Sequence, residues 1–110
     1  MAAYAILDVE IRDMERYREY MRQVKPVIEA AGGRYLVRGG AHKVVEGNWF
    51  PRRLVILEFP TMDAMLGFYL SPEYQSLKAL RQQSSTAHGA VAVEGIEDIE
   101  HIEHIEHIEG

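Results

Sequence analysis

Residues 32–59, GGRYLVRGGAHKVVEGNWFPRRLVILEF, contain the features that decide the fold of this chain. Two runs typical of β-strands lie near its ends, at residues 34–38 and 53–59, and both are rich in branched and aromatic side chains. A Gly-Gly pair follows the first run, which predicts a bulge or bend before the strand resumes at residues 43–46. Four arginines, the only tryptophan and the carboxylate of Glu58 are interleaved with these runs. This mixture indicates a polar pocket built against a sheet.

The flanking sequence supplies the other elements of one small domain, residues 1–95. A strand is expected over residues 3–11, a helix capped by Asp13 up to residue 31, helices over 62–70 and 72–84, and a last strand over 90–94. The resulting βαββαβ order predicts an α+β, ferredoxin-like fold with a four-stranded antiparallel sheet and its helices on one face.

Both faces of this predicted sheet are apolar. In the third strand Leu54 and Ile56 point one way, while Val55, Leu57 and Phe59 point the other. The helices can cover only one face, and an apolar face left open to water is usually a partner site. We therefore expect a homodimer in which two sheets pack against each other as a dimeric α+β barrel.

Composition narrows the class of protein further. The 110 residues are 47% hydrophobic and 26% charged, as expected of a globular domain, and they include no cysteine, so disulfides, thiolate catalysis and Cys-ligated zinc are excluded. Neither a signal peptide nor an apolar run of about 20 residues is visible, so we expect a cytoplasmic protein without membrane contact. Residues 1–95 carry twelve Lys and Arg against eleven Asp and Glu, a balance that argues against nucleic-acid binding.

Several separated motifs resemble one known family. The segments GGRYLVRGG, EGNWFPRRLVILEFP and YLSPEYQSLKALR, with YREY in the first helix and a final VEG, are similar to the "domain of unknown function 1330" family over residues 3–95. The resemblance implies a dimeric α+β barrel, a superfamily that includes cofactor-free monooxygenases and isomerases as well as haem enzymes. Its pattern selects, on this chain, Arg34, Gly40, Glu46, Trp49, Arg53, Glu58, Ser71, Tyr74 and Arg81.

The candidate catalytic residue is Glu58, which alternates with Leu54 and Ile56 on a largely apolar face. A carboxylate in that setting either has a raised pKa, suited to a general base, or forms a structural ion pair with Arg34, Arg38 or Arg81.

The candidate ligand-binding residues lie around this carboxylate. Arg34 and Arg38 are four residues apart on one strand, so they are expected to share a face, where they either clamp an anion or pair with acids. Trp49 either walls a planar ligand or anchors a dimer. The full predicted set is Arg34, Arg38, Glu46, Trp49, Arg53, Tyr74 and Arg81.

We therefore expect a homodimer with a pocket for a small organic anion, without a cofactor, that acts as an isomerase, lyase or monooxygenase. The alternatives are a non-catalytic ligand-binding or scaffolding dimer, and a metal carrier that uses the Ile/Glu/His repeat of residues 96–110. Histidines spaced three apart in that repeat suit loose binding of Zn²⁺ or Ni²⁺, although a solvated low-complexity tail is the simpler interpretation. No metal site is expected within the domain itself.

Overall fold

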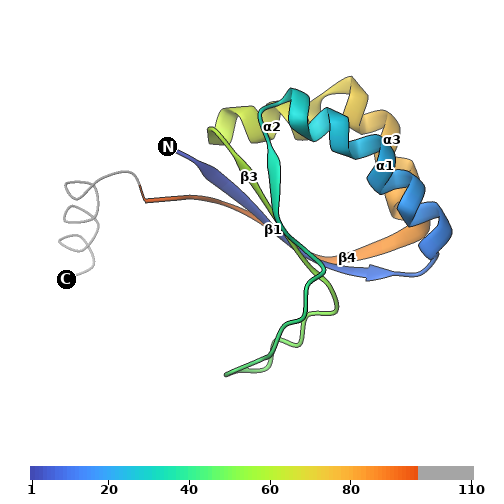
Figure 1. Cartoon of the computed structure of the whole chain (residues 1–110), viewed down its shortest axis with the longest axis vertical. Coiled ribbons are helices and arrows are strands. Elements are labelled where there is room, and N and C mark those ends of the chain that lie inside the picture. Colours follow the sequence, from blue (N-terminus) through green and yellow to red (C-terminus); the bar gives the residue numbers. More distant parts are fainter. Residues whose placement is uncertain (97–110) are drawn as a thin grey trace.

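The computed structural model of the chain describes residues 1–96 and has four strands and three helices in these residues (Figure 1). The elements are β1 (Ala3–Ile11), α1 (Met14–Ala30), β2 (Arg34–Arg38), β3 (Leu54–Phe59), α2 (Met62–Leu70), α3 (Pro72–Ser84) and β4 (Ser85–Glu94). The repeat of Ile, Glu and His lies outside the described residues from residue 97 onward.

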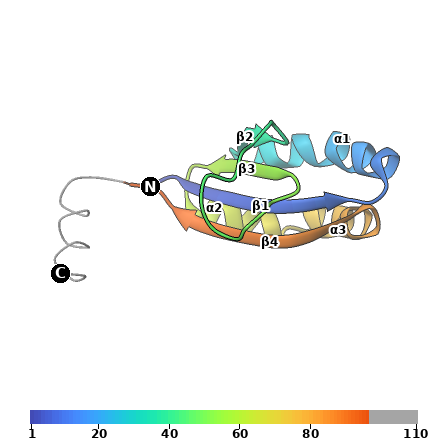
Figure 2. The same cartoon turned by 90° about the horizontal axis from the view of Figure 1, so that it is seen from below.

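The strands form one antiparallel sheet in the order β2-β3-β1-β4, with β1 in the centre between β3 and β4. All three helices lie on one face of this sheet, and the opposite face, called here the open face, carries no element of the described chain (Figures 1 and 2). Residues 39–53 leave the sheet on the open side as a long connection, called here the arm (Figure 1). The predicted ferredoxin-like α+β fold is confirmed.

Local sequence signals explain where the helices begin and end. The side chain of Asp13 accepts a hydrogen bond from the backbone of Arg16 and caps α1, and Gly32 ends that helix with a φ of +83°. Ser71 caps α3 by accepting from the backbone N–H of Tyr74 at 3.1 Å, with Pro72 at the first helical position. The Ser71 cap and Pro72 therefore explain why α3 begins as a separate helix directly after α2.

The core fills the layer between the helices and the sheet. On β3 the buried side chains are Val55, Leu57 and Phe59, which confirms the predicted alternation. From the helices, Val24 and Phe68 are among the buried residues that face them. This layer also encloses the cavity described below.

Two predicted strand boundaries were wrong. Residues 43–46 do not continue β2, because the arm turns away from the sheet and these residues are exposed without a partner strand in the part of the chain that is described. The last strand begins at Ser85 rather than at Ala90, because Ser85 pairs with Ile11 at the far end of β1. The small and polar residues of STAHG gave no alternating apolar pattern from which this extension is visible.

Candidate functional site

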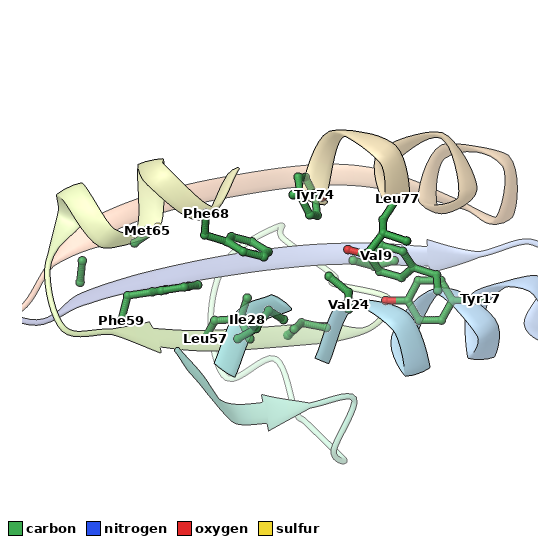
Figure 3. Close-up of a cluster of buried hydrophobic side chains, with 13 residues drawn as sticks. Val9, Tyr17, Val24, Ile28, Leu57, Phe59, Met65, Phe68, Tyr74 and Leu77 are labelled. Atoms are coloured by element: carbon green, nitrogen blue, oxygen red, sulfur yellow. The ribbon is translucent and has the colours of Figure 1, made fainter. Parts of the chain in front are cut away.

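A cavity of about 300 Å³ lies between the helices and the sheet. Its floor consists of the inward side chains of the two central strands, including Leu7, Val9 and Leu57, and its walls come from all three helices (Figure 3). Five tyrosines contribute to the lining: Tyr17, Tyr20, Tyr35, Tyr69 and Tyr74. This volume is at the lower end of the range of small-molecule sites, and mostly apolar walls with a few polar groups are typical of them.

Arginines gather at the end of the cavity that is near Tyr17. Arg38 and Arg81 line the cavity, and the guanidinium of Arg38 lies 5.0 Å from the centre of the Tyr35 ring. Arg53 lies beside them, with its guanidinium 5.9 Å from the centre of the Tyr17 ring. We call Arg38, Arg53 and Arg81, with the tyrosines they contact, the arginine end.

These three arginines have no carboxylate partner among residues 1–96, although seven ion pairs occur elsewhere in that part of the chain. The Nε atoms of Arg53 and Arg81 are buried and have no hydrogen-bond partner within the described residues. Arg53 approaches only neutral acceptors, namely the hydroxyl of Tyr17, the carbonyl of Arg38 at 3.5 Å and the sulfur of Met21 at 3.8 Å. Buried donor atoms without a partner are costly, so the two Nε atoms and the unpaired charges make the arginine end suited to an anionic ligand.

Tyrosine hydroxyls gather at this end, where Tyr17 accepts a hydrogen bond from Arg53 and Tyr35 accepts one from Arg38. Burial raises the pKa of Tyr17, and the nearby charges of Arg53 and Arg81 only partly oppose this effect. Burial also raises the pKa of Tyr20 and Tyr35. The phenols therefore stay protonated at neutral pH. No Asp, Glu or His lines the cavity, so its polar groups donate hydrogen bonds and positive charge and include no ordinary general base.

Glu58 lies on the open face and does not line this cavity. The Nε of Arg34 donates to Glu58 Oε1 at 2.7 Å. This hydrogen bond, with a smaller one from Tyr4, outweighs partial burial and lowers the pKa of Glu58. Of the two alternatives, the structure has the ion pair with Arg34, and a raised pKa is wrong. The catalytic role of Glu58 stays a prediction that this geometry does not favour.

Arg34 and Arg38 do not share a face, contrary to the prediction. A bulge between Tyr35 and Val37 shifts the register, so Arg34 lies opposite Glu58 on the open face while Arg38 lies opposite Val55 and faces the cavity. One extra residue in a strand reverses which way the following side chains point. The two residues therefore lie on opposite faces of the sheet, although both also line a second hollow at the edge of β2, beside Lys25 and Glu29.

The other predicted ligand-binding residues are divided in the same way. Tyr74 and Arg81 line the cavity, and Arg53 lies at its arginine end. Glu46 and Trp49 are on the arm, are exposed, and do not line the cavity. The structure thus brings together Arg38, Arg53, Tyr74 and Arg81, and it separates them from Glu58, Arg34, Glu46 and Trp49.

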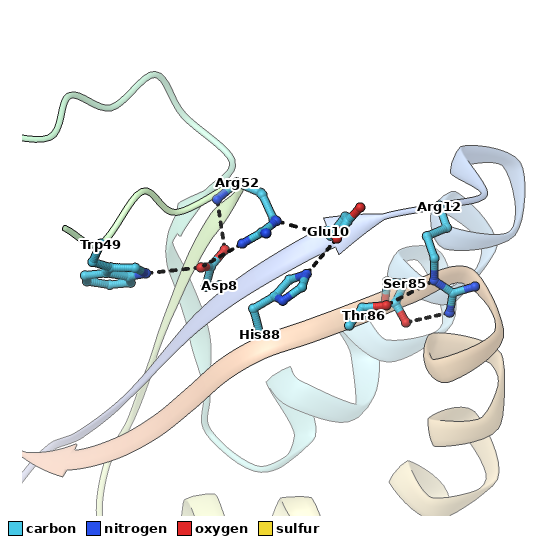
Figure 4. Close-up of polar contacts among 8 residues, drawn as sticks. All are labelled: Asp8, Glu10, Arg12, Trp49, Arg52, Ser85, Thr86 and His88. Carbon is cyan, nitrogen blue, oxygen red and sulfur yellow. Dashed lines mark hydrogen bonds and ion pairs between the residues drawn. The ribbon is translucent and has the colours of Figure 1, made fainter.

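A polar cluster on the open face was missed by sequence reasoning (Figure 4). Asp8 is only 4% exposed; it accepts hydrogen bonds from the indole of Trp49 at 3.1 Å and from the backbone N–H of Arg52 at 2.9 Å. Next to it, Glu10 lies 2.6 Å from His88 and 3.5 Å from Arg52. The only sequence signal was the presence of two acids, Asp8 and Glu10, inside the otherwise apolar strand AYAILDVEI. The cluster holds the end of the arm against the sheet.

Comparisons with known proteins agree with this fold. Residues 2–96 match the family called domain of unknown function (DUF1330), and the chain belongs to this family. A protein of unknown function from Rhodopseudomonas palustris, RPA0582, has a similar structure with a TM-score of 0.68 at 20% identity, covering 88% of this chain and 84% of that one. No protein of the curated set matches.

Two further solved structures share the fold. SnoaB, a cofactor-independent oxygenase from Streptomyces nogalater, superposes with a TM-score of 0.61 at 6% identity, covering 89% of this chain and 96% of that one. A dimeric ferredoxin-like protein of unknown function from Jannaschia sp. CCS1 gives 0.60 at 16% identity, covering 88% and 100%. At these identities the likeness shows the fold alone.

Two further findings concern the described residues only. None of their helices is long and apolar enough to cross a membrane. They also contain no group of three or more His, Cys, Asp or Glu side chains placed to hold a metal ion. The predicted metal-binding repeat lies almost entirely outside them.

Proposed function

We propose that this protein binds a small organic anion in the cavity between its helices and sheet, with the charged group at the arginine end. The observation that carries the proposal is that Arg38, Arg53 and Arg81 meet at one end of an apolar cavity without a carboxylate partner in residues 1–96. A bound oxyanion supplies the missing negative charge and accepts the unused hydrogen bonds.

The energetics favour an anion over a neutral ligand of the same shape. One charge about 4 Å from another interacts by about 4 kcal/mol at the effective dielectric constant of a partly buried site. Protonated Tyr17 adds a hydrogen-bond donor at the same end. The apolar lining around Leu57 and Phe68 selects an organic body over a small inorganic ion.

Calorimetric titration with 2-naphthoate and with the uncharged 2-naphthylmethanol tests this proposal. We expect the acid to bind at least tenfold more tightly than the alcohol, since only the acid pairs with the arginines. Arg81→Gln is expected to weaken the acid about tenfold to a hundredfold. Arg34→Gln is the matched control, because Arg34 lies outside the cavity and is expected to leave binding unchanged. Equal affinity for acid and alcohol contradicts the proposal.

The reaction that fits this site best is a cofactor-free oxygenation of a ligand that ionises on binding. The cavity offers positive charge and hydrogen-bond donors but no general base, which suits a substrate whose enol or phenol readily loses its proton. SnoaB, which shares the fold, is a cofactor-independent oxygenase. In such a reaction the substrate carbanion adds O₂, and the resulting peroxide loses water to leave a carbonyl group.

Oxygen uptake with anthrone, an easily enolised aromatic ketone, distinguishes an oxygenase from a non-catalytic ligand-binding protein. An oxygenase is expected to consume one O₂ and release one water and one anthraquinone for each anthrone. Arg81→Gln should slow this uptake while Arg34→Gln should not. Tight binding of anthrone without uptake above the rate in buffer would instead identify a non-catalytic ligand-binding protein.

We also infer that the protein is a homodimer paired through the open face. Val91 and Val93 on β4 lie on this face opposite Ile6 and Tyr4 and are largely exposed in the single chain. The arm projects on the same side and carries Val45, which is 95% exposed. A second copy would cover these apolar groups. The solved relative from Jannaschia is described as dimeric, which supports the inference.

A further inference from the structure

We infer that the ligand of this cavity is an amphiphile: its oxyanion lies at the arginine end, and its apolar part extends toward an opening between α2 and β4. This inference rests on the proposed function and adds the chemical class and orientation of the ligand. The lining is polarised: its two charged side chains, Arg38 and Arg81, belong to the arginine end, and the remaining lining residues are apolar or aromatic. The ammonium group of Lys78, which does not line the cavity, lies 5.3 Å from the centre of the Tyr69 ring.

The polarity follows the direction of β1. Tyr17 lies near Val9, toward the end of β1, while Phe59, Met65 and Phe68 lie at the opposite end of the same layer (Figure 3). The lining residues of β1 extend from Ala5 to Val9, and this length of strand spans about 13 Å. Arg53 lies at the Tyr17 end, because the backbone N–H of Val9 donates to its carbonyl and its guanidinium is 5.9 Å from the centre of the Tyr17 ring. Arg38 lies one step further along the sheet, on the row of Val55 and Leu7.

The opposite end opens to solvent between α2 and the edge strand β4. Of the lining residues on α2, Leu66 is 46% exposed and Tyr69 is 41% exposed. Across from them Ala90 and Ala92 point toward the helices, opposite Leu7 and Ala5 of β1, and their small side chains leave β4 uncovered. We call Leu66, Tyr69, Ala90 and Ala92 the apolar mouth.

An amphiphile satisfies both ends at once. Its charged group supplies acceptors for the buried Nε atoms of Arg53 and Arg81, and its apolar part covers Leu66 and Tyr69, which are otherwise partly exposed. Each methylene that moves from water into such a channel strengthens binding by about fourfold. A compact anion that fills only the arginine end leaves the apolar mouth exposed, so burial of the mouth adds nothing to its affinity.

Titration with hexanoate, octanoate and decanoate, and with 1-decanol, tests this orientation. The dissociation constant is expected to fall about fourfold per methylene, hence about 250-fold from hexanoate to decanoate, and decanol is expected to bind more weakly than decanoate. Leu66→Ser should flatten the dependence on chain length. Arg81→Gln should weaken all three acids by a similar factor and preserve the slope.

Leu70→Ser is the matched control, because Leu70 is on the same helix, is 69% exposed and does not line the cavity. It is expected to leave the series unchanged. If the three acids bind equally, or if Leu66→Ser leaves the slope intact, the amphiphile inference is overturned while anion binding stands. If none of the acids binds and 2-naphthoate does not bind either, the proposed function itself fails.

Discussion

Asp8 is the one carboxylate among the described residues that is almost fully buried. Burial opposes its ionisation, but hydrogen bonds from the backbone of Arg52 and the indole of Trp49, together with the charge of Arg52, hold its pKa below the usual value. Its partners are 41 and 44 residues away along the chain. A single side chain therefore links the arm to the centre of the sheet.

Replacing Asp8 by Asn is expected to reduce the free energy of unfolding by about 2 kcal/mol at pH 7, because two hydrogen bonds to a charged group are weakened. Urea unfolding measures this loss. Glu10→Gln is the matched control on the same strand; Glu10 is half exposed, and its replacement should change stability little.

The stability difference between wild type and Asp8→Asn is expected to depend on pH. The folded pKa of Asp8 is lowered, so its contribution is fully present above the unfolded pKa of about 3.9 and is lost as pH falls through the lower folded value. The stability difference between wild type and Asp8→Asn should therefore shrink as pH falls below about 4. A difference that stays constant down to acid unfolding would show that the charge of Asp8 contributes nothing.

The junction of β2 with the arm determines which arginines reach the cavity. Gly39 has a φ of +73°, and a Cβ on it would lie 2.0 Å from a terminal nitrogen of Arg53. Arg38 faces the cavity only because the bulge before it shifts the register of β2. This short segment therefore places two of the three arginines.

Gly39→Ala is expected to destabilise the fold by about 1–2 kcal/mol, because L-residues are strained at this φ, and to weaken anion binding by displacing Arg53. Urea unfolding and titration with 2-naphthoate measure the two effects. Gly40→Ala is the control, since a Cβ there meets nothing within 4 Å. Equal behaviour of the two variants would contradict this role for Gly39.

The fold was easier to predict from the sequence than the candidate site. The alternation of Leu54 to Phe59 and the Ser71-Pro72 cap depend on near neighbours, so the fold was predictable from them. The candidate site was predictable only in part. Arg38 and Arg34 were assigned to one face because a bulge leaves no simple trace in the residues themselves. The contact of Trp49 with Asp8 arises from the path of the arm, which no local pattern determines.

At the scale of the whole molecule, the open face carries apolar side chains, including Val91 and Val93, that no helix or strand of residues 1–96 covers. Light scattering is expected to give the mass of a dimer at micromolar concentration. Val93→Glu should shift the mass toward a monomer, because it places a charge on the open face. Leu70→Glu, on the helix side of the sheet, should leave the mass unchanged. A monomeric wild type would contradict the proposed dimer.

The same arrangement keeps the two surfaces apart. A partner on the open face leaves the cavity, its arginine end and the apolar mouth on the helix side. Ligand binding and dimerisation are therefore expected to be separable. Arg81→Gln should change only the affinity for the ligand. Val93→Glu should mainly change the molecular mass measured by light scattering.

The central claim is that the arginine end holds the charged group of an organic anion, and a crystal structure grown with decanoate tests it most directly. We predict density for the carboxylate among Arg38, Arg53 and Arg81, with the chain running toward Leu66 and Tyr69. Density against Arg34 and Glu58 on the open face, or an empty cavity at saturating decanoate, would contradict the account.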